Sequence, residues 1–195
     1  MINNLKNAKS CDSLLVHTCC APCSTYVFEK LIREDFNIEG FFYNPNIHPH
    51  EEYTRRLEEL LLYSETKKYR ITVKDEAPDR WYQTLLGLEC DNEGGNRCKA
   101  CFQLRLEETA IFASQNDFDG FTTTLTISPH KNAKVINEIG KKLEAKYGIY
   151  FLEADFKKND GFKKSLAISQ KYDLYRQSYC GCEYSICKAR APKQK

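Results

Sequence analysis

The amino-acid sequence predicts an α/β fold, in which a doubly wound, mostly parallel sheet of five strands lies between helices. Two observations predict it. Short apolar runs of strand length alternate with longer runs whose apolar residues recur every three or four positions. Polar connectors that contain Gly, Pro or Asn separate the two kinds of run. Because parallel strands need crossover connections, this alternation favours right-handed βαβ units, here in a single domain over residues 1–195.

Each expected strand is a short run of apolar or β-branched residues. The first run, SLLVH, is typical of a short buried strand, and the second, IEGFFY, stops at an Asn-Pro-Asn turn. The fourth, GFTTTLTI, is rich in β-branched residues, which favour strands. In chain order, the expected strands span residues 13–17, 38–43, 69–73, 120–127 and 149–153.

The expected helices each have apolar residues on one face. Pro22 is well placed in the first turn of the first helix, and Gly148 is a C-terminal stop for the fifth. The sequence predicts a flexible N-terminus over 1–12, an irregular cysteine-bearing C-terminal cap, and a basic tail over 188–195. The helices are expected over residues 22–32, 53–61, 81–86, 97–113, 135–143 and 162–168.

Composition limits the classes of protein that fit. Of the 195 residues, 42% are hydrophobic and 29% charged, a balance that indicates a globular rather than a disordered chain. The net charge of +2 neither requires nor excludes a nucleic-acid partner. No run approaches the roughly 18 consecutive apolar residues of a membrane span, and the run 14–16 is too short for a signal peptide. We therefore expect a cytoplasmic protein with no membrane partner.

Cysteine usage is unusual, with 10 cysteines in the chain. In a reducing compartment, a cysteine-rich protein of this size is more often metal-binding or redox-active than cross-linked. Nine of the ten fall into three groups far apart in sequence, which predicts one site assembled by the fold. The first group follows the first expected strand, at the sheet edge where ligands bind in doubly wound folds. The groups are Cys19, Cys20 and Cys23; Cys90, Cys98 and Cys101; and Cys180, Cys182 and Cys187, with Cys11 outside them.

A first unit pairs the adjacent Cys19 and Cys20 with Cys98 and Cys101, which lie three positions apart at a helix start. The positive end of a helix favours ionised thiols, and four thiolates suit zinc or an iron–sulfur cluster. Structural zinc sites more often use two Cys-x-x-Cys units, so the adjacent pair favours a cluster. Buried, inert cysteines are the alternative. Cys23 is a candidate extra ligand, whereas the three bystanders are Cys11, Cys90 and Cys187.

A second unit is Cys180-Gly181-Cys182. Two extended residues span about 7 Å, slightly more than a disulfide usually bridges, and Gly181 permits the bend that closes the gap. The small ring would be strained and easily reduced, as catalytic disulfides are. Alternatively, the two sulfurs bind a metal ion beside the first site, or they are unrelated surface thiols.

Other polar residues offer weaker signals. His17, on the first strand, is interpreted as a hydrogen-bonded core residue, whereas His48 and His130 follow strands and could face a ligand or stabilise loops. Asp91 and Asp155 are candidate acids. The basic stretch 157–164 offers cations for phosphates, and nearby side chains offer rings for stacking, as single-stranded RNA binding requires. These side chains are Tyr172, Tyr175, Arg176 and Tyr179.

Several motifs together resemble the cobalamin-independent epoxyqueuosine reductase family, QueH, over about residues 13 to 188. The most specific are the three cysteine blocks in this order, and two further segments are also similar. The cysteine blocks are 17–23 (HTCCAPC), 97–102 (RCKACF) and 174–182 (LYRQSYCGC), and the further segments are 43–49 (YNPNIHP) and 124–129 (TLTISP).

The resemblance implies the last step of queuosine synthesis, in which the epoxide oxygen of epoxyqueuosine in tRNA is removed reductively. It implies a [4Fe-4S] cluster held by Cys19, Cys20, Cys98 and Cys101. It also implies a redox-active pair at Cys180 and Cys182, for which binding of an additional iron ion is the alternative. The implied fold is the Rossmann-like HUP fold of adenine nucleotide alpha-hydrolases. Cysteines replace their phosphate-binding loop here, so nucleotide hydrolysis is not expected.

On this interpretation, an iron centre acts as a Lewis acid on the epoxide, and the dithiol or an unidentified electron donor supplies electrons. The candidate proton donors are Tyr179, Asp91 and His48, and Arg176 is a candidate substrate contact. The tRNA partner presents its modified base in the anticodon loop, where extrusion from the stack costs little. Two rival functions remain open: a zinc-stabilised RNA-binding protein, and a thiol–disulfide oxidoreductase or tRNA thiolation enzyme.

Overall fold

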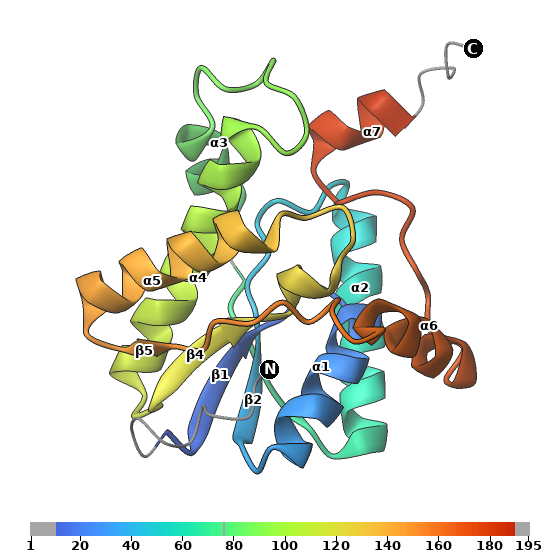
Figure 1. The fold of residues 1–195 in the computed structure, drawn as a ribbon. Coiled ribbons are helices and arrows are strands. Elements are labelled where there is room, and N and C mark those ends of the chain that lie inside the picture. The colour runs from blue at the N-terminus through green and yellow to red at the C-terminus, as the bar shows by residue number, and fades with distance from the viewer. Residues whose placement is uncertain (1–10, 76, 190–195) are drawn as a thin grey trace.

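The computed structural model describes residues 11–75 and 77–189, and it confirms the predicted α/β class (Figure 1). Five strands form one sheet in the order β3-β2-β1-β4-β5, and every neighbouring pair is parallel. In this order β1 is the central strand, and its carboxyl end lies between those of β2 and β4. The strands are β1 (Ser13–His17), β2 (Asn37–Phe42), β3 (Arg70–Val73), β4 (Gly120–Thr123) and β5 (Tyr150–Phe151).

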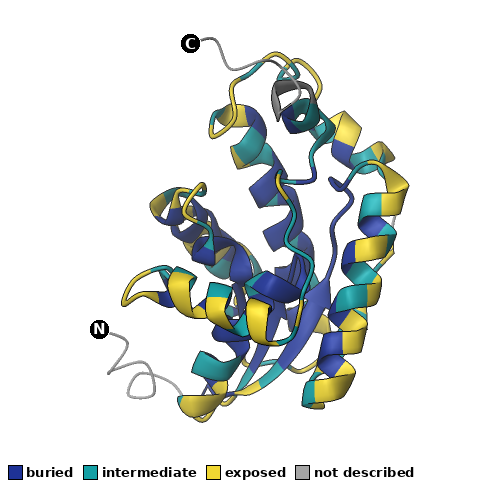
Figure 2. Ribbon diagram, turned by 90° about the vertical axis from the view of Figure 1, so that its right-hand side faces the viewer, coloured by how far each residue is buried: buried dark blue, intermediate teal, exposed yellow. Residues whose placement is uncertain are grey.

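Helices cover both faces of the sheet, as Figure 1 shows: α4 and α5 lie on one face, and α1, α2 and α6 lie on the other. In Figure 2, the outer sides of the helices are mainly exposed, and the sides toward the sheet are mainly buried. The helices are α1 (Ala21–Arg33), α2 (His50–Lys67), α3 (Asp79–Thr84), α4 (Asn96–Gln115), the 3-10 turn η2 (Thr124–Ile127), α5 (Ala133–Tyr147), α6 (Gly161–Lys171) and α7 (Glu183–Ala189).

The alternation of side chains along β1 divides the core into two layers. Leu15 packs with Phe102 of α4 and Ile136 of α5, whereas Leu14 packs with Phe28 of α1. Successive strand residues point to opposite faces, so each face of β1 buries its own apolar set. The sheet is thus fixed from both sides, and its carboxyl edge becomes a rigid platform.

Two expectations about secondary structure are corrected. The fourth strand ends at Thr123, and residues 124–127 form a 3-10 turn, because the Thr123 hydroxyl accepts a hydrogen bond from the Leu125 N–H at 3.1 Å and turns the chain. The C-terminal cap is irregular only up to Cys182, after which α7 begins at Glu183. The predicted helix stop is confirmed, since Gly148 adopts a left-handed conformation (φ 67°) after α5.

The predicted N-terminal segment 1–12 and basic tail 188–195 fall largely outside the described residues. Asp12, which is described, is hydrogen-bonded to the rest of the domain. Its N–H donates to Asp119 Oδ2 at 3.0 Å, and its carbonyl accepts from the Asn37 N–H. None of the helices in the described ranges is long and apolar enough to cross a membrane.

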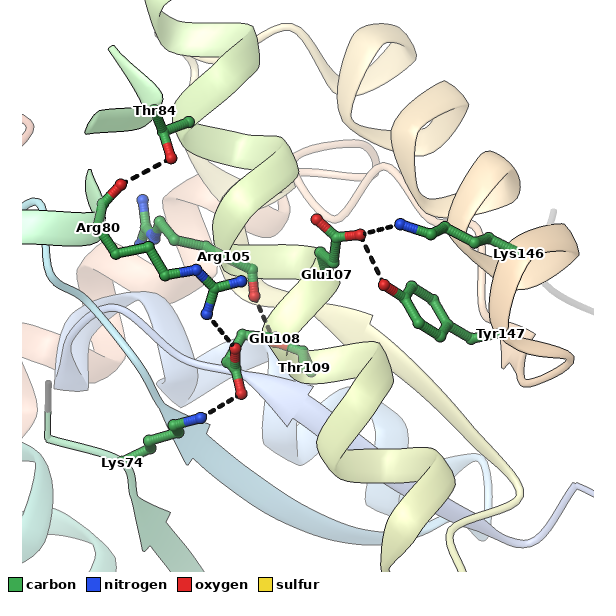
Figure 3. Close-up of polar contacts among 9 residues, drawn as sticks. All are labelled: Lys74, Arg80, Thr84, Arg105, Glu107, Glu108, Thr109, Lys146 and Tyr147. Carbon is green, nitrogen blue, oxygen red and sulfur yellow. Dashed lines mark hydrogen bonds and ion pairs between the residues drawn. The ribbon is translucent and has the colours of Figure 1, made fainter. Parts of the chain in front are cut away.

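Ion pairs fix α4, the helix that presents Cys98 and Cys101 (Figure 3). Glu108, buried on α4, binds Lys74 and also Arg80, the latter at 2.7 Å. At the preceding position, Glu107 accepts a hydrogen bond from the Tyr147 hydroxyl of α5 at 2.6 Å. Partners on three other segments therefore set the position of α4 relative to the sheet.

Candidate metal centre and adjoining cavity

Three thiols meet where β1 passes into α1. Cys19 and Cys20 follow β1, Cys23 lies in the first turn of α1, and their sulfur atoms all lie within 4.8 Å of one another. The Cys19 and Cys20 sulfurs are 3.8 Å apart. The chain is extended at Cys20 and turns into α1 at Ala21, and the hydroxyl of Ser24 donates to the Cys20 carbonyl at 2.8 Å. The turn thus directs adjacent cysteines into one small volume.

The thiols in this trio influence one another strongly. Hydrogen bonds from Cys20 and Cys23 hold the pKa of Cys19 well below its usual value. The hydrogen bond to Cys19, together with burial, raises the pKa of Cys20 to about 12, and the hydrogen bonds to Cys19 and Cys20, together with burial, raise that of Cys23. One thiolate stabilised by two thiols is a donor set ready to bind a cation once the remaining protons leave.

A second group of thiols comes from the start of α4. Cys98 and Cys101 lie one turn apart and pack in the same apolar cluster as Cys19 and Cys20. The Gly94 N–H donates to the Cys98 sulfur at 3.2 Å. The four cysteines of the predicted quartet thus share one region of the core, although the tightest group is the trio that includes Cys23.

Asp91 organises the start of α4. Its carboxylate accepts hydrogen bonds from the N–H groups of Arg97 at 3.0 Å and Asn92 at 2.9 Å. These backbone donors hold its pKa below the usual value, so the carboxylate stays ionised. The buried Arg97 side chain then donates to the carbonyls of Glu89 and Asp91. Asp91 therefore stabilises the segment that presents Cys98 and Cys101.

The third group lies on a strap, which we define as residues 177–182. The Gln177 amide Nε2 donates to the Cys20 sulfur at 3.2 Å, which joins the strap to the trio. Cys182 packs against the same apolar cluster, and burial raises its pKa to about 12. Cys180 has no disulfide partner, and burial together with the proximity of Cys180 raises the pKa of both Cys98 and Cys101. All three cysteine groups therefore converge, as predicted.

Two cations face this sulfur-rich region, one buried and one half-buried. Arg105, buried on α4, donates to Asn44 Oδ1 at 2.6 Å, and its charge acts on Cys19 and Cys101. Although burial opposes its charge, Lys131 has a raised pKa because it faces the thiols of Cys180, Cys19 and Cys23. These cations offset the negative charge that thiolate ligands would bring into the core.

A cavity of about 690 Å³ adjoins the thiols. Cys23, Cys98 and Cys180 contribute to its lining, which also contains the rings of Phe102 and Phe162. Its polar lining residues include Glu93, His130, Lys131, Asn132, Arg176, Gln177 and Tyr179. A volume of this size can hold a small molecule. Ligand pockets are usually lined, as this one is, by aromatic rings and a few polar groups.

The remaining predicted site residues lie at different distances from this cavity. Arg176 and Tyr179 line it, with Arg176 donating to Ser169 Oγ at 3.0 Å and the Tyr179 hydroxyl donating to the His48 carbonyl at 2.6 Å. The His48 ring instead packs against Trp81 and Tyr82, and burial lowers its pKa.

The other residues that the sequence singled out have structural surroundings. His17 is fully buried beside Thr123, with burial lowering its pKa to about 3, so the ring is a neutral core group as predicted. Asp155 pairs with Lys157 at 3.1 Å. Cys11 is buried away from the trio and Cys90 is exposed, whereas the Cys187 side chain lies outside the described part of the chain.

Sequence reasoning missed two contributors, Lys131 and Gln177. Lys131 follows a loop and had no motif to mark it, whereas Gln177 lay inside a recognised block but had no assigned role. Only the fold, which brings both against the thiols, distinguishes them from surface residues.

The donor chemistry fits a metal. Thiolates are soft ligands that select zinc, copper(I) or iron–sulfur clusters over hard cations, and no carboxylate accompanies the buried trio. Hydrogen bonds to the sulfurs and nearby cations are the surroundings in which such centres are tuned. The residues present therefore constitute a buried cysteine cluster that could bind a metal.

Comparisons with known proteins agree over almost the whole chain. A family profile described as "Epoxyqueuosine reductase QueH" matches residues 14–188. Curated relatives with that same description include proteins from Streptococcus pyogenes serotype M1 and Acinetobacter baylyi. The first is 43% identical over 179 residues, covering 89% of this chain and 70% of the relative. The second is 39% identical over 183 residues, covering 93% and 84%.

A relative from Thermotoga maritima, also described as epoxyqueuosine reductase QueH, is 35% identical over 184 residues, covering 91% of this chain and 92% of its own. Among solved structures, a predicted subunit of a tRNA methyltransferase from Methanocaldococcus jannaschii aligns with a TM-score of 0.54 at 12% identity, covering 80% of this chain and 74% of that one. At that identity, the likeness concerns the fold alone.

Proposed function

The chain belongs to the epoxyqueuosine reductase QueH family, and from this premise we propose that its sulfur-rich site is where epoxyqueuosine in tRNA becomes queuosine. As a member of that family, the protein is an oxidoreductase that reduces epoxyqueuosine in queuosine biosynthesis. The observation that supports the proposed location is the convergence of cysteines from three distant segments beside one cavity.

We propose that Cys19, Cys20, Cys98 and Cys101 hold a [4Fe-4S] cluster. When bound, such a cluster supplies electrons one at a time. Support comes from the packing of the four thiols in one apolar cluster and from the cations that face them. Cys23, the third member of the trio, is then free of the cluster, or available as a donor to an additional iron ion.

The Cys180 and Cys182 pair is proposed to supply reducing equivalents. Removal of an epoxide oxygen breaks two C–O bonds, forms a C=C bond and releases water, and it consumes two electrons and two protons. Oxidation of two thiols to one disulfide releases two electrons and two protons, so the reaction balances. An electron donor outside the chain must then reduce the disulfide. Both thiols are free in the structure, and Cys180 lines the cavity.

Among the predicted proton donors, the geometry favours Tyr179. Tyr179 lines the cavity, and its hydroxyl would exchange its hydrogen bond to the His48 carbonyl for one to the substrate, whereas the His48 ring packs against aromatic rings and the Asp91 carboxylate is held by the backbone at the start of α4. The rings of Phe102 and Phe162 are suited to an extruded base. They lie within the cavity that the strap borders.

We propose that the tRNA backbone approaches over the basic side of the cavity. Lys131 and Arg176 line the cavity there, and Lys157 is next to Lys131, because its ammonium group donates to the Lys131 carbonyl at 3.3 Å. Glu93 is the one carboxylate among the described residues that line the cavity. Phosphates favour the cationic side, where each released counterion adds to affinity.

The test combines metal analysis with a turnover assay. Protein purified without oxygen is expected to contain iron and acid-labile sulfide in near-equal amounts, and to convert epoxyqueuosine to queuosine in tRNA, as detected by nucleoside mass spectrometry. Cys101→Ser should lose the iron and sulfide of the cluster, whereas Cys23→Ser should keep both. Cys180→Ser should keep iron but lose multiple turnover, and the exposed Cys90→Ser is the matched control.

Two outcomes would contradict the proposal. A colourless protein that contains zinc and binds tRNA without converting it would favour an RNA-binding function. Multiple turnover by Cys180→Ser with its iron intact would remove the dithiol from the reaction.

A further inference from the structure

Three consecutive carbonyl groups of the strap are hydrogen-bonded to the body of the protein. Arg56 Nη2 donates to the Tyr179 carbonyl at 3.3 Å, and Arg56 Nη1 donates to the Cys180 carbonyl at 3.1 Å. The His48 N–H donates to the Gly181 carbonyl at 2.7 Å. The main chain on both sides of the Cys180 side chain is thus fixed, while the thiol itself has no disulfide partner.

Arg56 is itself held firmly on α2. Its side chain is only 1% exposed, and its Nε donates to Glu52 Oε1, one helical turn earlier, at 2.6 Å. The other oxygen of Glu52 accepts a hydrogen bond from the Tyr175 hydroxyl at 3.0 Å, just before the strap. The guanidinium also lies 5.4 Å from the centre of the Tyr179 ring. All of these contacts orient Arg56 toward the strap.

The close approach of Arg56 explains the glycine between the two cysteines. Gly181 has a φ of 106°, which side chains rarely permit. A Cβ at this position would lie 3.0 Å from Arg56 Nη1 and 3.1 Å from Ile47 Cγ1. Glycine therefore allows both the bend and the guanidinium contact, and the Cys-Gly-Cys sequence fits against Arg56.

From these contacts, we propose that Arg56 is the positioning residue of the Cys180–Cys182 pair, holding the strap over the sulfur site. The inference rests on the proposed function, since it gives the pair its role. All three nitrogens of the planar guanidinium donate in a fixed geometry, so one residue binds Glu52 and two successive carbonyls together. Lysine has the same charge without this geometry, and so cannot reproduce the arrangement.

The chain offers a matched control for this arrangement. Arg33 on α1 pairs with Glu29 at the same helical spacing, at 2.8 Å, but its side chain is 68% exposed. Arg56→Lys and Glu52→Gln test the strap, while Arg33→Lys and Glu29→Gln change the same kind of pair elsewhere. Glu52→Gln keeps the arginine and preserves side-chain shape, so it provides a milder second variant.

The experiment measures alkylation of each cysteine in the native, anaerobically prepared holoenzyme by iodoacetamide, with peptide mass spectrometry. Arg56→Lys should increase the alkylation rates of Cys180 and Cys182 about tenfold, because the lost hydrogen bonds from a charged donor permit the strap to open. Glu52→Gln should cause a smaller increase. Buried Cys11 reports global unfolding and exposed Cys90 reports intrinsic reactivity, so both rates should stay unchanged.

A turnover measurement separates positioning from general stability. Arg56→Lys should lower kcat for epoxyqueuosine tRNA with little change in KM, and Arg33→Lys should change neither. Unchanged alkylation of Cys180 and Cys182 in both strap variants would overturn the proposal, as would an equal increase at Cys11. If Cys180→Ser stays active, the redox role of the pair fails, yet the alkylation result still decides whether Arg56 holds the strap.

Discussion

Replacement of Gln177 by Leu should lower the reduction potential of the proposed cluster. The change removes the amide N–H that donates to the Cys20 sulfur at 3.2 Å, while keeping a side chain of comparable volume. Reduction adds one negative charge to a cluster, so a hydrogen bond to its sulfur is stronger in the reduced state. Loss of the bond therefore disfavours reduction.

The expected size follows from the strength of such bonds. A hydrogen bond to a charged group contributes about 1.5–3 kcal/mol, and only the difference between the two oxidation states affects the potential. If that difference is about 1 kcal/mol, the shift is roughly 40 mV, because a tenfold change, or about 1.4 kcal/mol, corresponds to 59 mV for one electron. We therefore expect a potential about 40 mV more negative in Gln177→Leu.

The assay is a redox titration of the anaerobic protein, monitored by the paramagnetic resonance signal of the reduced cluster. Gln170→Leu, at an exposed position on α6, is the control and should leave the potential unchanged. Iron content must match between the two variants. An unchanged or more positive potential in Gln177→Leu would refute the reasoning, since it would mean that Cys20 is not a ligand or that the amide does not bind its sulfur.

Two further predictions concern stability. Gly140→Ala should destabilise the fold by about 1–3 kcal/mol, measured by thermal unfolding, because its Cβ would lie 2.3 Å from the Phe151 ring. Although burial opposes ionisation of Glu108, ion pairs with Lys74 and Arg80 lower its pKa. Its stabilising effect is therefore complete above the unfolded pKa and is lost as pH falls through the lower folded value. Urea unfolding between pH 7 and pH 3 should show this loss, and Glu108→Gln should be less stable at pH 7 with a flatter pH dependence; an equally steep profile would contradict the assignment.

Much of the fold follows from local patterns. Strand-length runs such as 13–17 and the helix stop at Gly148 depend on neighbouring residues, so the sequence predicts them closely. The extent of β4 depends instead on the hydroxyl of Thr123, which competes with the strand hydrogen bonds and turns the chain early. Threonine favours strands in general, so composition alone predicts a longer strand.

The candidate site shows the same division. Spacing predicted that Cys19, Cys20, Cys98 and Cys101 would share a region, because strand ends and helix starts of a parallel sheet meet at one edge. The roles of Arg56 and Gln177 depend on contacts that span more than 100 residues along the chain. Sequence periodicity concerns residues a few positions apart, so it cannot predict such contacts. His48 illustrates the limit, since its place after β2 was predictable but its packing against Trp81 was not.

The wide separation of the cysteines along the chain has a consequence for biogenesis. A ribosome synthesises Cys19 early, yet Gln177 and Cys180, which complete the surroundings of its neighbour Cys20, emerge about 160 residues later. Until then, the early thiols have only part of their final environment. Delivery of the proposed metal would therefore belong to a late stage of maturation, after the parallel sheet has formed and the strap has closed over the sulfur atoms.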